Sequence, residues 1–299
     1  MEKSSSATVA INPHHTLLGA ENAILAGTNR RYHVPDYEGC LSVKSVVAGS
    51  ATWEAGGRRF VVHENSYLIL NDRQRYTMTI DAAREVTTFC LFFKRGLVED
   101  VFRSYAAPAA ALLDTPAEPC APRLHFWEKL ETEAGGVLSG VRELRRQLVG
   151  GVASRASLEP YFYAVADRMV WGHLEMCATV GRLAPLRAST RLELYRRLLR
   201  GRDYILSSLC EPILLGDMAR EACLSPYHFH RTFSQVFHET PHRYLTRHRL
   251  ERARHLLRQT DRSVTEICFE CGFESLGSFS SLFRRRFGMS PRTFRAART

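Results

Sequence analysis

The sequence predicts an α+β protein in which a small antiparallel β-barrel or sandwich with accompanying helices precedes an all-α module. Three observations lead to this prediction. Short segments rich in β-branched and aromatic residues follow one another at even spacing between residues 41 and 94. Helical periodicity begins after residue 122 and continues through most of the remaining chain. One supersecondary pattern then occurs twice in the last third.

The predicted strands lie in one block and are separated by turn-forming pairs. The pairs are Gly56-Gly57, Glu64-Asn65, Asn71-Asp72 and Asp81-Ala82. The strands themselves are LSVKSVVAG at 41–49, RRFVVH at 58–63, YLILN at 67–71, YTMTID at 76–81 and EVTTFCLFF at 85–93.

Helices follow this block after a proline-marked loop at 114–122. We expect a helix over 123–149, broken near Gly135-Gly136, and a second over 158–178. The stretch at 181–190 is a predicted linker. The predicted domains are therefore 1–180 and 191–299, and from residue 192 onward the pattern is helix and tight turn.

Length and composition indicate an ordinary folded protein. A chain of 299 residues is long enough for about two domains with cores of their own. It contains 45% apolar and 24% charged residues, and no apolar run approaches the roughly 20 residues of a membrane helix. Its start lacks the apolar core of a secretory signal, and its 8 cysteines have no framework spacing. We therefore expect a cytoplasmic protein with reduced thiols and no membrane partner.

The positive charge is concentrated at one end. Residues 191–299 contain 20 Arg, no Lys and 11 acidic residues, a net +9. The preceding part, 1–190, contains 21 basic and 20 acidic residues, a net +1. A basic segment with many apolar residues indicates a folded module whose surface attracts polyanions. Arginine favours two-pronged contacts with phosphate or guanine.

The repeat in this basic third is visible when residues 214–245 are set above 264–294. In the first part, Leu215, Met218 and Leu224 match Val264, Ile267 and Phe273 at an offset of 49. In the second part the offset is 50, and Phe229, Phe233, Phe237, Pro241 and Tyr244 match Phe279, Phe283, Phe287, Pro291 and Phe294. One extra residue after the turn explains the change of offset.

Each copy is predicted to form a short helix, a tight turn and a second helix. Ser225 before Pro226 has the character of a helix start, and Gly272 with Ser275 serves the same purpose in the second copy. Two helices joined in this way form a helix-turn-helix, whose second helix can enter the DNA major groove. The alternative is a pair of ordinary helical hairpins, but duplication within the basic third favours DNA binding.

The two copies are joined by PHRYLTRHRLERARHLLRQT at 241–260. This segment is predicted to be a basic amphipathic helix, with Leu245, Leu250, Ala253 and Leu257 near one side. Neighbouring major-groove segments on one side of B-DNA lie about 34 Å apart. A rigid helix between the copies would hold two readers at a fixed separation.

On the duplicated unit, the joining helix and the closing run GFESLGSFSSLFRRRFGMSP, the chain resembles the AraC/XylS family of bacterial transcription regulators. The resemblance is specific over 195–299 and looser over 1–190. It implies an N-terminal cupin-like β-barrel with helices and a DNA-binding domain of seven helices. It also implies promoter DNA and RNA polymerase as partners, an unidentified small-molecule effector, and a homodimer formed through the N-terminal domain.

The resemblance also assigns the DNA contacts. In the first copy, Tyr227, His230 and Arg231 match the positions that the family directs at bases, and Arg231 can form two hydrogen bonds to guanine. The alternative is a solvated helix face. The corresponding second-copy residues are Leu276, Gly277, Ser278, Ser280 and Ser281, of which we expect base contacts from Leu276, Ser278, Ser280 and Ser281. Serine at 281, where the family often has a long donor, indicates weak base reading. The three arginines that follow suit phosphate contacts, and they are Arg284, Arg285 and Arg286.

The sequence supports no metal, cofactor or catalytic residue. Cys268 and Cys271 form a C-x-x-C pair, but they align with Ala219 and Ala222 and have no partner pair at zinc spacing, so we interpret them as core. A metal-dependent cupin enzyme fused to a DNA-binding domain is the alternative function, although the predicted strands at 41–94 do not contain the H-x-H pair, followed by Glu, that the barrel of such an enzyme would show. A DNA-repair methyl acceptor would need a four-cysteine zinc cluster, which Cys40, Cys90 and Cys120 are too dispersed to form. We therefore predict a sequence-specific, effector-responsive activator.

Overall fold

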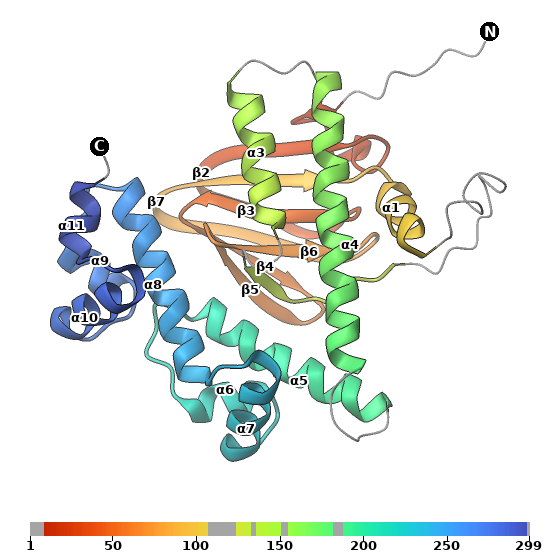
Figure 1. Ribbon diagram of the computed structural model, residues 1–299. Helices are drawn as coiled ribbons and strands as arrows, with labels where there is room; N and C mark the ends of the chain where they lie inside the picture. Colours follow the sequence, from red (N-terminus) through yellow and green to blue (C-terminus); the bar gives the residue numbers. More distant parts are fainter. Residues whose placement is uncertain (1–8, 107–123, 133–135, 151–154, 182–187, 298–299) are drawn as a thin grey trace, which may run out of the picture. The chain divides into compact units, whose positions relative to one another are not determined.

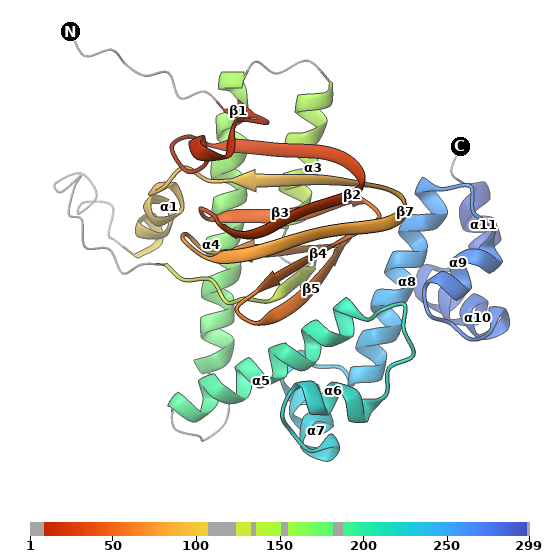
Figure 2. The ribbon, with the colours of Figure 1, turned by 180° about the vertical axis from the view of Figure 1, so that it is seen from behind.

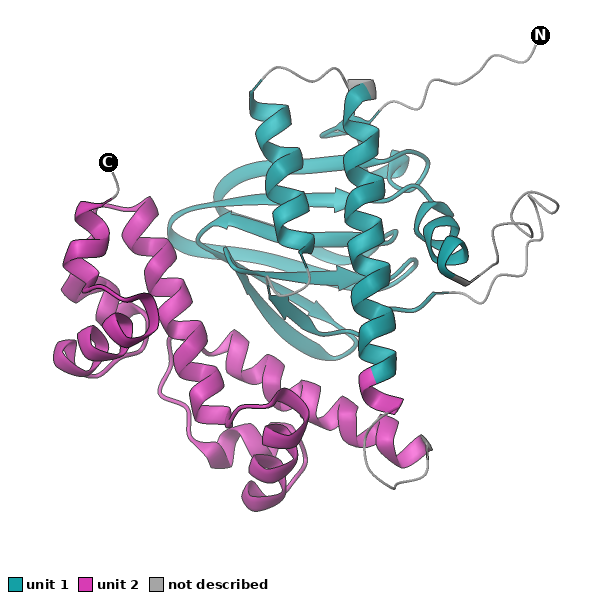
Figure 3. Ribbon diagram, viewed as in Figure 1, with its two compact units in different colours: residues 1–178 teal, residues 179–299 magenta. Residues whose placement is uncertain are grey.

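The computed structural model describes residues 9–106, 124–132, 136–150, 155–181 and 188–297. The chain divides into two compact units, Met1–Ala178 (unit 1) and Thr179–Thr299 (unit 2), which Figure 3 shows in different colours. The predicted α+β class is confirmed, with a β-rich first part and an all-helical second part. The predicted loop at 114–122 and the centre of the predicted linker, 182–187, lie outside the described residues.

Unit 1 is built on one eight-stranded sheet. Its order is β1-β2-β7-β3-β6-β8, and β4 pairs with both β5 and β7 (Figures 1 and 2). The sheet has the barrel-like or sandwich-like arrangement that the sequence predicts, and it is not closed. The strands are β1 (Ala10–Ile11), β2 (Ala23–Glu38), β3 (Ser42–Ala48), β4 (Ser50–Ala55), β5 (Arg58–His63), β6 (Ser66–Leu70), β7 (Arg75–Phe92) and β8 (Leu130–Thr132).

The strand prediction needs two corrections. The turn expected at Asp81-Ala82 is absent, and β7 runs without a break where two strands were predicted. Pairing with β2 continues on both sides of this point, where Asp81 pairs with Arg31 and Val86 with Asn29, and the register shifts between them. On its other edge β7 pairs with β4 before the shift and with β3 after it, so the chain continues as one strand with an irregularity in place of a turn. Strands β2 and β4 were also not predicted, whereas the turns at Gly56-Gly57 and Glu64-Asn65 are confirmed.

Two helices cover one face of this sheet (Figure 1). They are α3 (Val137–Val149) and α4 (Glu159–Gly181), and α1 (Leu97–Ala106) lies near the end of β7 in the sequence. The predicted helix at 158–178 is confirmed. The one predicted over 123–149 is wrong in its first half, since Leu130–Thr132 pairs with β6 as a strand. The apolar core between helices and sheet includes Leu91, Phe93, Phe162 and Val165, each fully buried.

The described part of unit 2 consists of seven helices. The first helix-turn-helix copy is α6–α7, the second is α9–α10, and α8 joins them as predicted. In chain order the helices are α5 (Ala188–Ser207), α6 (Leu215–Glu221), α7 (Pro226–Phe237), α8 (Pro241–Gln259), α9 (Val264–Glu270), α10 (Leu276–Phe287) and α11 (Pro291–Ala296). No helix among the described residues is long and apolar enough to cross a membrane.

Candidate nucleic-acid interface

The turn between the helices has the same construction in both copies. In the first copy the Leu224 N–H donates to the carbonyl of Ala219 at 2.9 Å. At the matching position of the second copy, the Phe273 N–H donates to the carbonyl of Cys268 at 3.1 Å. The residue before each of these donors is in the left-handed region, with φ of +52° at Cys223 and +77° at Gly272.

A serine begins the second helix of each copy, as predicted. The Ser225 hydroxyl accepts a hydrogen bond from the His228 N–H at 3.3 Å. The Ser275 hydroxyl accepts one from the Ser278 N–H at 3.1 Å. Each cap satisfies a backbone donor that the first turn of a helix leaves without an intrahelical partner.

Each copy has its own row of packed aromatic rings, the phenylalanine ladder, formed by Phe229, Phe233 and Phe237 in the first copy and by Phe279, Phe283 and Phe287 in the second. These ladders confirm the predicted core. Phe229, Phe233, Phe279 and Phe283 are fully buried. The rings of Phe233 and Phe237 lie 4.4 Å apart between centroids, and their counterparts Phe283 and Phe287 lie 4.5 Å apart. Across to the following helix, Phe233–Tyr244 and Phe283–Phe294 are both 5.5 Å. The aromatic cores of the two copies therefore share one packing scheme.

The exposed face of α7 carries the three residues predicted to read bases. Tyr227 is 77% exposed, and His230 and Arg231 are also exposed. Tyr227 and Arg231 are four residues apart and therefore share one side of the helix. Together they present a phenol, an imidazole and a guanidinium, and each has hydrogen-bonding groups for base edges or phosphates.

The exposed face of α10 is chemically different. Leu276, Ser278 and Ser281 are exposed, but Ser280 is half-buried and therefore less available than predicted. The Ser278 hydroxyl also lies 3.0 Å from that of Ser275, within the helix cap. In the first two turns of α10, this face therefore has no side chain as long as that of Arg231.

The three arginines of α10 are all exposed but do not have equal surroundings. Arg286 forms an ion pair with Glu251 at 3.1 Å, and Arg254 pairs with the same carboxylate at 2.9 Å. Arg286 is therefore held towards α8. Arg284 lies three residues after Ser281 and so shares its side of the helix, one turn further along.

The cysteines of the C-x-x-C pair are part of the core. Cys268 and Cys271 are fully buried in the apolar cluster of the second copy, beside Ile267 and Phe279. Burial raises the pKa of the Cys268 thiol, which keeps it protonated. Among the described residues, no cluster of three or more His, Cys, Asp or Glu side chains has the arrangement of a metal site.

Comparison with known proteins gives consistent results. Residues 218–297 match the family model described as a helix-turn-helix domain. Over 254 residues the chain is 30% identical to the HTH-type transcriptional activator RhaS of Klebsiella pneumoniae (strain 342), covering 85% of this chain and 84% of the relative. Over 88 residues it is 51% identical to RhaS of Salmonella heidelberg (strain SL476), covering 29% of this chain and 32% of the relative. Among solved structures, an AraC-type DNA-binding domain protein from Chromobacterium violaceum is 33% identical over 38% of this chain and 97% of its own, with a TM-score of 0.33.

Proposed function

The chain belongs to the AraC/XylS family of DNA-binding transcription regulators, and from this premise we propose that it activates promoters by reading DNA unequally with its two helix-turn-helix copies. The observation that carries the proposal is the contrast between the matched cores and the unmatched exposed faces of α7 and α10. The alternative of a metal-dependent cupin enzyme finds no support in the comparisons.

The first copy makes the specific contacts in this proposal. Arg231 reads guanine through O6 and N7, and His230 reads one base edge. Tyr227 lies one turn before Arg231 and contacts a base or the sugar-phosphate backbone. Exposure of all three side chains supports these roles.

The second copy mainly positions the protein on DNA. Leu276, Ser278, Ser280 and Ser281 make weak base contacts, of which Ser280 contributes least because it is half-buried. Arg284 and Arg285 bind phosphates, which fix register without carrying sequence information. Arg286 contributes less than either neighbour, since Glu251 already compensates its charge.

The remaining partners also belong to the proposal. Unit 1 binds a small-molecule effector and forms a homodimer, and the DNA-bound regulator contacts RNA polymerase in the cytoplasm. Support comes from 30% identity to a transcriptional activator along 85% of this chain. In this proposal 1–180 senses the effector and 191–299 binds DNA, and the separation of the chain into two compact units, Met1–Ala178 and Thr179–Thr299, supports it.

DNA binding of the full chain at several salt concentrations tests the proposal. Each neutralised phosphate contributes about −0.9 to the slope of log K against log salt. We expect a steep slope that Arg285→Ala makes shallower by about one contact, with Arg84→Ala, an exposed arginine of unit 1, as the matched control. A flat salt response, or an equal change of slope for both variants, would contradict the assignment.

A further inference from the structure

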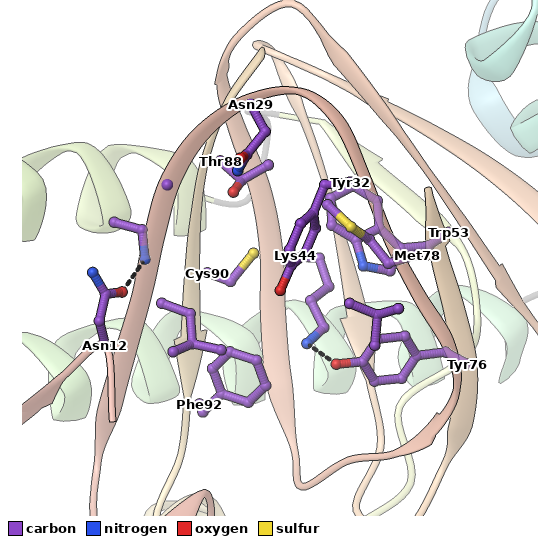
Figure 4. A pocket seen from close by; sticks show the side chains of 14 residues that line it. Asn12, Asn29, Tyr32, Lys44, Trp53, Tyr76, Met78, Thr88, Cys90 and Phe92 are labelled. Carbon is purple, nitrogen blue, oxygen red and sulfur yellow. Dashed lines mark hydrogen bonds between the residues drawn. The ribbon is translucent and has the colours of Figure 1, made fainter. Parts of the chain in front are cut away.

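A cavity of about 260 Å³ lies inside the open sheet of unit 1. It is on the face of the sheet opposite α3 and α4. Side chains alternate along β7, so Phe89 and Leu91 face the helices while Cys90 and Phe92 face the cavity. Its walls are mostly apolar, and polar side chains, among them Asn12 and Asn29, also line it (Figure 4).

One cationic side chain points into this apolar space. Lys44 of β3 is 1% exposed, and its ammonium donates a hydrogen bond to the Tyr76 hydroxyl at 3.0 Å (Figure 4). The nitrogen lies 3.8 Å from the centroid of the Phe92 ring and 4.4 Å from that of Tyr76. Among the residues that the structure describes, no carboxylate is paired with it.

The surroundings compensate this charge only in part. Contacts with aromatic faces stabilise an ammonium by less than its removal from water costs. Burial accordingly lowers the pKa of Lys44 to about 8, which still leaves it mostly protonated at neutral pH. Burial raises the pKa values of Tyr76 and Cys90, so neither supplies a negative charge. An anion entering the cavity would complete the missing ion pair.

We propose that this cavity binds a small monocarboxylate with an apolar body, whose carboxylate pairs with Lys44 and whose body packs against Trp53, Met78 and Phe92. One ammonium matches one negative charge, whereas a phosphate group of nearly two charges would stay half-compensated. The cavity is smaller than the roughly 300–1,000 Å³ of sites for drug-sized ligands, so the ligand is small. This inference names the chemical class of the proposed effector, and the regulatory role of the ligand rests on the proposed function.

Binding is measured on the full chain without DNA, so its failure is separate from failure of the regulatory proposal. The probes are acetate, hexanoate and 3-phenylpropionate, each paired with its neutral amide. Trp53 lines the cavity and reports occupancy by fluorescence, and thermal unfolding gives a second signal. We expect saturable binding of hexanoate and 3-phenylpropionate, with their amides at least tenfold weaker.

Two variants separate charge recognition from packing. Lys44→Met keeps a chain of similar length without the charge and should remove the preference for carboxylate over amide. Lys94→Met changes an exposed lysine of the same unit and should leave the preference intact. Melting of Lys44→Met near or above the wild-type temperature would show that it folds, as expected when a buried charge is replaced by an apolar group.

The pH dependence of carboxylate affinity gives a further test, because a lysine with a purely structural role would not affect it. Tyr76 and Cys90 keep raised pKa values, and burial raises the pKa of Cys40 to about 11, so these groups stay protonated as Lys44 titrates. Tyr32 also lines the cavity, and measuring the same pH profile on Tyr32→Phe controls for any contribution of its hydroxyl. Carboxylate affinity should therefore fall about tenfold per pH unit above about 8. Equal binding of acids and amides, unchanged carboxylate binding by Lys44→Met, or no saturable binding of any probe would overturn the proposal.

Discussion

The two helix-turn-helix copies of this protein have the same aromatic core packing but carry different side chains on their exposed helix faces. The ring centroids lie 4.4 Å apart in Phe233–Phe237 and 4.5 Å apart in Phe283–Phe287, and both copies have 5.5 Å across to the next helix. On the exposed faces, by contrast, Arg231 corresponds to Ser281. Core packing constrains volume and shape at every buried position, whereas an exposed helix position changes at little cost in stability. The two copies therefore keep one framework, while the exposed faces proposed to contact DNA differ between them.

The copies also differ where the backbone enters the left-handed region. The first copy uses Cys223 (φ +52°) and His238 (φ +57°), and the second uses Gly272 (φ +77°) and Gly288 (φ +79°) at the matching positions. A side chain with a Cβ pays a steric penalty there that glycine avoids. The first copy thus has the more strained backbone and the second the more relaxed one.

Acidification should distinguish the copies most strongly. His248 packs on Tyr244 of the first copy at 4.5 Å between centroids, whereas Phe294, the counterpart of Tyr244, lies beneath Arg258. Burial, helped by Arg247, lowers the pKa of His248 to about 3. Below pH 6.5, His248 takes up a proton in the unfolded chain but stays neutral in the folded chain. The free energy of unfolding therefore falls as the pH drops from 6.5 towards 3, by a total of about 5 kcal/mol.

The measurement is the free energy of unfolding between pH 7 and pH 4 for wild type and His248→Gln. The variant should lose much of the pH dependence in this range. His242→Gln changes an exposed histidine of the same helix and is the control, which should behave as wild type. Parallel pH profiles for wild type and His248→Gln would show that His248 is not held neutral.

Truncation of the ladder should affect both copies to a similar degree. Phe233→Ala and Phe283→Ala each leave a cavity in a closed core and should cost about 3–5 kcal/mol. Phe269→Ala is the matched control, because that ring is 55% exposed and should cost little. Denaturant unfolding of the three variants checks this. If only one ladder variant is destabilised, the two cores are not equivalent.

Exchanging the turn residues should have opposite signs in the two copies. Gly272→Ala places a Cβ 2.9 Å from the Leu209 carbonyl oxygen and the Arg249 guanidinium, at a positive φ, and should cost about 1–3 kcal/mol. Cys223→Gly relieves the steric penalty and should change stability by no more than about 1 kcal/mol, towards greater stability. Thermal unfolding of both variants measures the signs. Equal destabilisation by both would remove the proposed difference in strain.

Most of unit 2 could be predicted from sequence because its signals are local. Phenylalanines at i, i+4 and i+8 share one face of a helix, and Ser225 before Pro226 marks a helix start, whatever the rest of the chain does. Duplication doubled each signal. Cys223 in the left-handed region was not predicted, although alignment with Gly272 indicates it.

Unit 1 was harder because its strands depend on distant partners. Much of β2 is exposed, and its residues from Thr28 to Glu38 read as a polar loop until β7 is placed beside them. Pairing of β7 with β2 on both sides of Asp81-Ala82 likewise makes this point part of one strand, with a shift of register. Burial of Lys44 could have been predicted, because it is the only charged residue in the otherwise uncharged strand segment LSVKSVV.

The most direct test of unequal reading is selection of bound sequences from a random DNA pool by the full chain. We expect information content concentrated in the major-groove segment facing the first copy. Arg231→Ala should relax one or two base pairs there, since a two-pronged arginine–guanine contact discriminates by about 1–3 kcal/mol. Arg285→Ala should weaken binding to all sequences alike and leave the motif unchanged. Equal information content in both segments, or an unchanged motif for Arg231→Ala, would contradict the account.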